Sequence, residues 1–144
     1  MYYKILTSYE EILEGIELWN NSVDKMVIRE ELIKQNVFSP FSGVNVVGMG
    51  GFNERSMVSF VLLKYLTLKI KNYCDKDRGW ISLLAVDRDK RNKNILWENI
   101  LVRAENFLQS KGCKNIYFGG DPQNFIPGLP HILISDYLSI FKKH

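Results

Sequence analysis

The spacing of hydrophobic and polar residues divides this chain into short strands and amphipathic helices. Strands are predicted where apolar and β-branched residues run together, over residues 2–6, 44–49, 56–65, 80–86 and 115–118. Helices are predicted where apolar residues recur every three or four positions, around 12–19 and over 28–36, 95–110 and 135–143. The order of elements is therefore β-α-α-β-β-β-α-β-α, which is typical of an α/β domain.

Local signals mark the start of the first helix. Either Thr7 or Ser8 can act as its N-cap, and Glu10 and Glu11 then fall in the first turn, where the helix dipole favours anions.

Glycines follow the strand at 44–49. Gly50, Gly51 and Asn53 are turn signals between that strand and the one at 56–65, so an antiparallel hairpin is expected with its turn in this segment.

Residues 80–118 read as one βαβ unit. The run WISLLAV (Trp80–Val86) is almost continuously apolar, which is typical of a strand buried on both faces. A helix follows at 95–110, and Gly112 is a signal for its C-cap. Because strand, helix and strand Asn115–Phe118 follow one another directly, the two strands are expected to pair in parallel through a right-handed crossover.

Length and composition favour one ordinary domain. The chain has 144 residues, of which 46% are hydrophobic, so it can bury a real core. The longest apolar run is too short to span a bilayer and the N-terminus has no signal-peptide pattern, so a cytoplasmic protein without a membrane partner is expected. Cys74 and Cys113 lack CxxC spacing, so free thiols and no metal site are expected.

Positive charge is concentrated in one place. The net charge is +3, and Arg88–Lys93 alone sums to +3 from four cations and one anion. Such a segment before a helix can hold a phosphate or pyrophosphate, because a helix N-terminus presents unpaired N–H groups. Neither a P-loop nor a GxGxxG motif is present. A solvated surface turn remains an alternative, whereas nucleic-acid binding is not expected because the patch lacks interleaved aromatic residues.

The stretch from residue 81 to residue 121 resembles the acetyl-CoA-binding motif of the GNAT superfamily of N-acetyltransferases. In that motif a strand is followed by Q/R-x-x-G-x-G/A and a long helix. The matching residues in this chain are Arg91, Asn92, Lys93, Asn94, Ile95 and Leu96. A second segment, GGDPQNFIPGLP, is similar to a stretch found in GNAT proteins with two tandem domains.

The resemblance implies a GNAT-like fold, with a mixed, mostly antiparallel sheet and a splayed parallel pair at 80–86 and 115–119. It implies that the backbone of Leu84, Ala85 and Val86 pairs with the pantetheine arm of acetyl-CoA. Main-chain N–H groups of the six motif residues would hold the pyrophosphate. In this family an amine attacks the acetyl carbonyl, which a backbone amide of the strand polarises, so the expected partner is a small-molecule or peptide amine.

The chain departs from the GNAT pattern at three positions. Asn94 and Leu96 stand where the motif has small residues. Asn tolerates left-handed backbone, whereas the side chain of Leu96 either crowds the pyrophosphate or turns into the core. Phe141 occupies the place of the usual tyrosine acid, and Tyr137 lies one turn earlier. No catalytic residue is therefore assigned from the sequence.

The family continues with two further strands beyond the segment that matches residues 140–144. We therefore expect one GNAT-like domain over 1–144 that is incomplete at its C-terminus or is the first part of a longer protein. A dimer partner or a second GNAT domain would then cover the sheet edge. His131 fits either a general base or, because it has no fixed acidic partner in the sequence, a structural or solvent-exposed residue. Asp121 and Asn124 fit either a ligand-binding edge or a turn.

Two functions follow from these observations. The first is an acetyl-CoA-dependent N-acetyltransferase, or one domain of it, acting on an unidentified amine. The alternative is a catalytically degenerate GNAT domain with a structural or acyl-CoA-sensing role.

Overall fold

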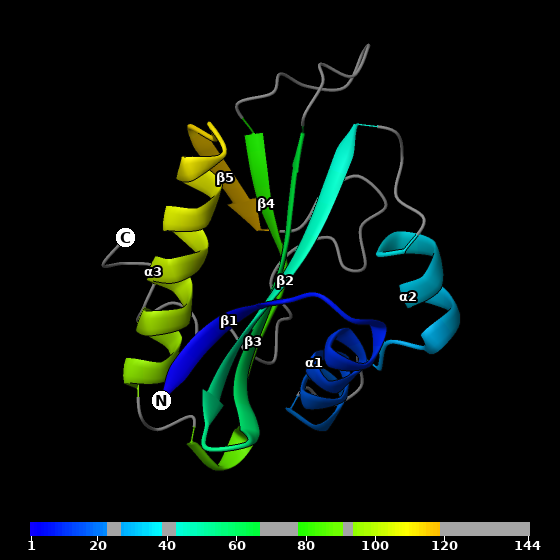
Figure 1. The fold of residues 1–144 in the computed structure, drawn as a ribbon, viewed down its shortest axis with the longest axis vertical. Helices are drawn as coiled ribbons and strands as arrows, with labels where there is room; N and C mark the ends of the chain where they lie inside the picture. The colour runs from blue at the N-terminus through cyan, green and yellow to red at the C-terminus, as the bar shows by residue number, and fades with distance from the viewer. Residues whose placement is uncertain (23–26, 39–42, 67–77, 91–93, 119–144) are drawn as a thin grey trace.

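A five-stranded sheet with helices on both faces forms the described part of the chain (Figure 1). The computed structural model describes residues 1–22, 27–38, 43–66, 78–90 and 94–118. The strands follow in the order β1-β2-β3-β4-β5, with bounds Tyr2–Leu6, Val44–Asn53, Ser56–Leu66, Arg78–Val86 and Asn115–Phe118. Helix α3 (Asn94–Ser110) covers one face, and α1 (Tyr9–Ser22) and α2 (Glu30–Asn36) lie on the other.

The sheet is mixed, as the sequence predicted. Strands β1 to β4 pair antiparallel with their neighbours, and β4 pairs with β5 in parallel. The parallel register runs from Arg78↔Asn115 to Ile81↔Phe118. Because β5 is described only as far as Phe118, the expected splay of the two strands stays a prediction.

Helix α1 begins with a capping box. The backbone N–H of Glu11 donates to Oγ of Ser8 at 3.1 Å, and the backbone N–H of Ser8 donates to Oε1 of Glu11 at 3.2 Å. This reciprocal pair satisfies two N–H groups at the start of the helix. Of the two candidate caps, Ser8 is therefore the N-cap. The backbone N–H of Thr7 donates to the same oxygen, Oε1 of Glu11, at 3.2 Å.

Helix α2 begins at Glu30, which is two residues later than predicted. The expectation that it starts at Ile28 was wrong, because the side chain of Asn20 holds the backbone of Ile28. The N–H of Ile28 donates to Oδ1 of Asn20 at 2.8 Å, and Nδ2 of Asn20 donates to the carbonyl of Ile28 at 3.0 Å. Arg29 is then extended, with φ −87° and ψ 154°. The apolar side chain of Ile28 is nevertheless buried, which explains why the sequence pattern included it.

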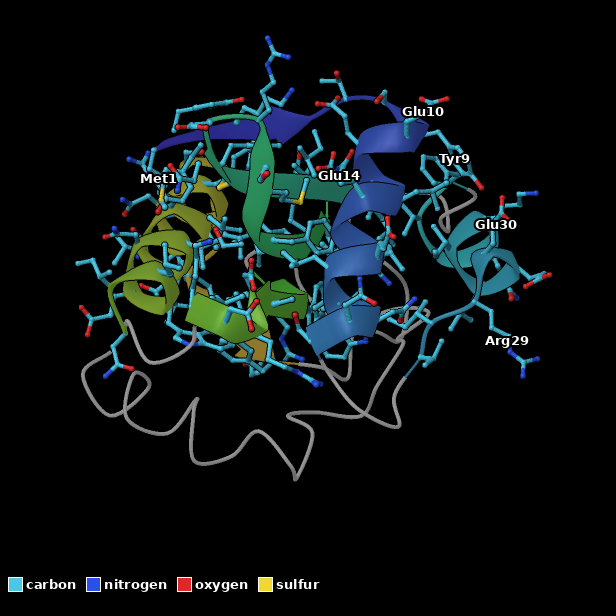
Figure 2. The ribbon with its side chains drawn as sticks, turned by 90° about the horizontal axis from the view of Figure 1, so that it is seen from below. Met1, Tyr9, Glu10, Glu14, Arg29 and Glu30 are labelled. Carbon is cyan, nitrogen blue, oxygen red and sulfur yellow. The ribbon has the colours of Figure 1, made fainter. Side chains whose placement is uncertain are left out.

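A hydrogen bond joins α1 to α2 at the surface. The hydroxyl of Tyr9 donates to the carboxylate of Glu30, and Figure 2 shows the two side chains meeting between the helices. This bond is the main reason that the pKa of Tyr9 is raised to about 12.

The hairpin between β2 and β3 turns later than expected. Gly50 and Gly51 are not in the turn: β2 continues through both to Asn53, which pairs with Ser56, and Glu54 adopts a left-handed φ of 58°. The glycine at 51 serves packing instead, because a Cβ there would lie 2.3 Å from Oγ of Ser59. The prediction of a hairpin is confirmed, but its turn was misplaced.

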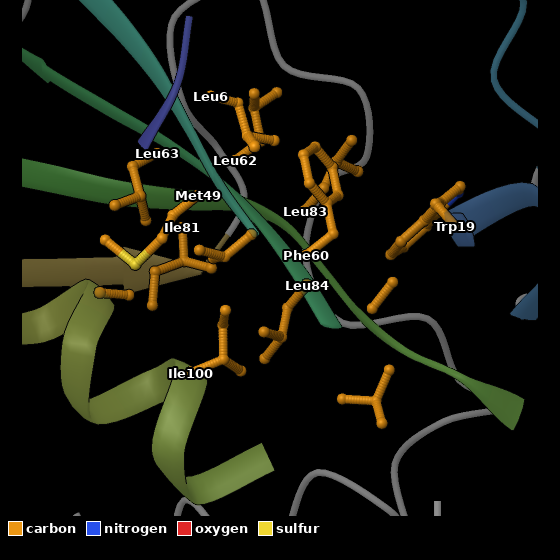
Figure 3. Packing of buried hydrophobic residues seen from close by; sticks show 14 of the residues in the cluster. Leu6, Trp19, Met49, Phe60, Leu62, Leu63, Ile81, Leu83, Leu84 and Ile100 are labelled. Atoms are coloured by element: carbon orange, nitrogen blue, oxygen red, sulfur yellow. The ribbon is translucent and has the colours of Figure 1, made fainter. Parts of the chain in front are cut away.

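The core lies on both faces of β3 and β4 (Figure 3). Phe60 and Leu83 pack with Trp19 of α1, while Leu84 lies on the side of Ile100 from α3. Both strands are buried along almost their whole length, as their continuous apolar sequences predicted.

Helix α3 ends at a glycine C-cap. Gly112 has a φ of 89°, its N–H donates to the carbonyl of Gln109, and the N–H of Cys113 donates to the carbonyl of Leu108, both at 3.0 Å. This is the Schellman arrangement, and it confirms the predicted end of the helix. The chain then enters β5.

Candidate functional site

The junction between β4 and α3 is closed by Asp87. Its N–H donates to the carbonyl of Val58 at 2.8 Å, which continues the pairing of β4 with β3. Its carbonyl accepts the N–H of Lys90 at 2.9 Å, and its carboxylate accepts the N–H of Asp89 at 3.0 Å. These bonds fold the segment Arg88–Lys90 into a 3₁₀ turn that directs the chain toward the start of α3.

The same aspartate lowers the local charge. Oδ2 of Asp87 lies 3.9 Å from Nζ of Lys90, and both side chains are about one-third exposed. Residues 88–93 alone have a net charge of +3. When Asp87 is included, residues 87–93 hold four cations and two anions, and their net charge is +2. The junction remains positive, because the cations outnumber the anions even with Asp87 included.

The first turn of α3 differs from those of the other two helices. Helix α1 has Glu10 and Glu11 in its first turn and α2 has Glu30 and Glu31, whereas α3 has no acidic residue there. Carboxylates in a first turn interact with the helix N-terminus in place of an external anion. The start of α3 therefore has no first-turn carboxylate that would repel a bound phosphate.

Leu96 points into the core. Its side chain is 3% exposed and belongs to the main hydrophobic cluster, while neighbouring Ile95 is 57% exposed and Asn94 is also exposed. Of the two orientations left open by the sequence, the structure shows the one that leaves the helix terminus uncrowded. The remaining motif residues lie outside the described residues: Arg91, Asn92 and Lys93.

The predicted contact residues of β4 are buried. Leu84, Ala85 and Val86 pair with Val61, Phe60 and Ser59 of β3, in that order. Their side chains pack in the core. Any contact of these three residues with a cofactor would therefore use the backbone at the other edge of β4, on the side of β5.

Several candidates lie outside the described residues. They are Cys74 and every candidate after Phe118: Asp121, Asn124, His131, Tyr137 and Phe141. Cys113 is a buried cysteine just after the end of α3. In the described ranges no group of three His, Cys, Asp or Glu side chains could hold a metal ion, and no helix is long and apolar enough to cross a membrane.

Two features of the structure were not predicted from the sequence. One is a bulge in β4, where Leu62↔Leu83 is followed by Leu63↔Ile81, so that Ser82 has no residue of β3 opposite. The strand is buried on both faces, so its sequence has no regular alternation of polar and apolar residues from which such an insertion could be recognised.

The other is an open cavity of about 250 Å³ between β1, β2 and α3. Its lining residues are Tyr3, Lys4, Ile5, Met49, Arg103 and Asn106. They come from three separate segments, and none was a candidate site residue. The guanidinium of Arg103 lies 4.1 Å from the centre of the Tyr3 ring.

Comparison with known proteins identifies the fold. No protein-family model matches the sequence, and no curated protein matches it. Solved structures do match. A soil-metagenome aminoglycoside acetyltransferase, meta-AAC0020, in complex with sisomicin has a TM-score of 0.65 at 15% identity, over 99% of this chain and 84% of that one.

Two further structures agree. The ribosomal-protein-alanine N-acetyltransferase of Brucella melitensis biovar Abortus 2308 has a TM-score of 0.62 at 12% identity, over 99% of this chain and 91% of that one. The aminoglycoside N-acetyltransferase AAC(6')-Iy in complex with CoA has a TM-score of 0.54 at 9% identity, over 96% of this chain and 89% of that one. The chain therefore has the GNAT acyltransferase fold, which confirms the predicted fold class.

Proposed function

We propose that this chain is an acetyl-CoA-dependent N-acetyltransferase, or one domain of such an enzyme. The observation that carries the proposal is the start of α3, which follows a buried strand and a basic turn, has no first-turn acid, and has Leu96 withdrawn into the core. A helix N-terminus of this kind suits a pyrophosphate. A neighbour of the same fold is in complex with CoA, which supports acyl-CoA as the ligand class.

The binding residues follow from this assignment. We assign the pyrophosphate to the backbone N–H groups of six residues, namely Arg91, Asn92, Lys93, Asn94, Ile95 and Leu96. The pantetheine arm is assigned to the backbone of Leu84, Ala85 and Val86. When bound, the acetyl thioester supplies the activated acyl group for transfer to an amine.

The chain's own contribution is electrostatic and steric. Backbone N–H groups of β4 would stabilise negative charge that develops on the carbonyl oxygen, in a site from which the buried strand excludes water. The acceptor is proposed to be a primary amine on a small molecule or a peptide. Two neighbours of the same fold, an aminoglycoside acetyltransferase and a ribosomal-protein-alanine acetyltransferase, support these two classes.

Thermal melting with acetyl-CoA, combined with thiol release, tests the proposal. At 100 times its dissociation constant a ligand adds about 2.7 kcal/mol to the free energy of unfolding, so a clear rise in melting temperature is expected. Thiol release is then measured with sisomicin and with a peptide that begins with alanine. No melting shift would contradict the proposal, whereas a shift without thiol release would favour the non-catalytic, acyl-CoA-sensing alternative.

A pair of charge variants locates the anion site. Asn94 and Asn99 are both exposed on α3, in the first turn and in the second. Asn94→Asp places a negative charge at the helix N-terminus and should weaken CoA binding about ten-fold at low salt, since like charges repel there. Asn99→Asp is the matched control and should have a much smaller effect. Equal effects of the two variants would contradict the assignment.

A further inference from the structure

The open cavity between β1, β2 and α3 lies outside the proposed acyl-CoA site. Arg103, on its wall, is about two and a half helical turns beyond Asn94 along α3. The cavity volume of about 250 Å³ is slightly below that of pockets for drug-sized ligands, which is roughly 300–1,000 Å³. Its size therefore suits one small organic molecule.

One side of this cavity is apolar. Ile5 of β1 and Met49 of β2 are partners in the antiparallel register, so their side chains lie on the same face of the sheet. Ile5 is 39% exposed, which is unusual for a large aliphatic side chain in a strand, and the flexible side chain of Met49 adapts to different apolar shapes. These two residues can contact the hydrocarbon part of a ligand.

Arg103 supplies a cation that is already held in place. Its guanidinium lies over the ring of Tyr3, 4.1 Å from the ring centre, and the hydroxyl of Tyr3 donates to Sδ of Met1 at 3.4 Å. Stacking uses one face of the guanidinium and leaves the N–H donors in its plane available. Among the described residues, no carboxylate forms an ion pair with Arg103.

The rest of the lining adds a donor and no negative charge. The second cation, Lys4, already has an ion pair with Glu11 of α1. Asn106 is three residues after Arg103, so the two side chains are neighbours on the surface of α3. The side-chain amide of Asn106 has no hydrogen-bond partner in the described ranges. The cavity therefore offers one uncompensated guanidinium and one amide beside an apolar wall.

We propose that this cavity binds a small organic carboxylate. The carboxylate accepts two parallel hydrogen bonds from the edge of the Arg103 guanidinium and one from the amide of Asn106. The hydrocarbon part of the ligand packs against Ile5 and Met49, so an inorganic anion would use only half of the site. This binding site goes beyond the proposed acyl transfer and does not depend on it.

Titration of the ¹⁵N-labelled protein with benzoate tests the proposal. Backbone amide shifts should be concentrated at Tyr3, Ile5, Met49 and Arg103. Benzamide has nearly the same shape without the charge, and inorganic phosphate has the charge without the ring, so each should bind at least about ten-fold more weakly than benzoate. A spectrum unchanged at millimolar benzoate, or equal affinity for either control compound, would overturn the proposal.

Two isosteric charge variants locate the carboxylate. Asn106→Asp adds a negative charge to the cavity wall next to Arg103 and should weaken benzoate binding about ten-fold, because the new carboxylate repels the ligand and competes for the guanidinium. Asn115→Asp, at an exposed position of β5 on the other side of the sheet, is the matched control and should have no effect. Equal effects of the two variants would show that benzoate binds elsewhere.

Arginine variants test the contact itself. Arg103→Gln should weaken benzoate binding about ten-fold, and Arg103→Lys should restore only part of the affinity because lysine lacks the planar fork. Arg29→Gln is the control, since Arg29 is also exposed and Figure 2 shows it on the far side of the molecule from Met1. Full affinity in Arg103→Gln would overturn the role of the guanidinium.

The outcome can be separated from that of the proposed function. CoA should not displace benzoate, because the two sites are distinct. Displacement by CoA, or benzoate shifts at Leu84–Val86 and Asn94–Leu96 instead of the cavity, would place the carboxylate in the acyl-CoA site and overturn the proposal. A protein that binds benzoate in the cavity but no CoA would retain this site and lose the proposed function.

Discussion

Glu11 joins three parts of the N-terminal region through one carboxylate. It forms an ion pair with Lys4 of β1, accepts the backbone N–H groups of Thr7 and Ser8, and belongs to the first turn of α1. Lys4 has the largest effect, followed by the N–H of Thr7, and together these contacts lower the pKa of Glu11 to about 2. The carboxylate therefore stays charged in the folded protein at pH values where it is protonated in the unfolded chain.

The linkage between this pKa and stability has a definite sign. Because the pKa falls from 4.5 in the unfolded chain to about 2 when folded, the stabilisation is complete above pH 4.5 and is lost as the pH falls to 2. Glu11→Gln should lower the melting temperature at pH 7, and its difference from the wild type should shrink over that interval. Glu17→Gln, on the exposed side of the same helix, is the control. A difference that stays constant down to pH 2 would contradict this account.

At the level of helices and strands, Gly15 allows α1 to pack close to the sheet because it has no side chain. A Cβ on Gly15 would lie 2.2 Å from the ring of Phe60, which is fully buried in β3. Gly15→Ala improves helix propensity by about 1 kcal/mol, yet it should destabilise the protein by about 1–3 kcal/mol because the ring cannot move away. Urea unfolding measures the change, with Asn21→Ala on the exposed face as control. Stability equal to or above that of the wild type would show that α1 can shift outward.

The first turn of α3 makes a second prediction at this scale. Leu96→Ala should lower the free energy of unfolding by about 2–5 kcal/mol, because its side chain is 3% exposed. Ile95→Ala, at the exposed neighbour, should change it by less than about 0.5 kcal/mol. Neither variant should improve CoA binding. Tighter binding by Leu96→Ala with no loss of stability would instead place that side chain over the helix N-terminus.

Elements were predictable from sequence where local pattern decides them. The long apolar run of β4, the helical stripe of α3 and its glycine C-cap each depend on neighbouring residues, and all three are confirmed. Gly51 was misread because its packing partner, Ser59, comes from another strand. The start of α2 was missed because Asn20, eight residues earlier, binds the backbone of Ile28. Contacts made at a distance leave no periodic signal.

At the level of the whole molecule, the cavity and the proposed cofactor segment lie toward opposite edges of the sheet. The β1 edge, with α3, forms the cavity of about 250 Å³, while the proposed cofactor segment lies near the other edge, on β4. From Asn94 to Arg103 the axis of α3 rises about 14 Å at 1.5 Å per residue. The cavity and the proposed cofactor site are therefore separate.

In the described part of the chain, β5 is the last strand of the sheet. The sequence expectation that a dimer partner or a second domain covers this edge stays a prediction. The fold itself was predictable because the motif around Arg91–Leu96 fixes the order of strand, turn and helix. No catalytic group of the proposed enzyme could be predicted, because Phe141 stands where the GNAT pattern has its usual tyrosine acid.

Whether CoA binds along β4 and at the start of α3 can be read from the backbone amide spectrum of the ¹⁵N-labelled protein during titration with CoA. We expect shifts concentrated at Leu84–Val86 and Asn94–Leu96, with little change at Tyr3 and Arg103. Shifts confined to the cavity residues, or a spectrum unchanged at millimolar CoA, would contradict this expectation.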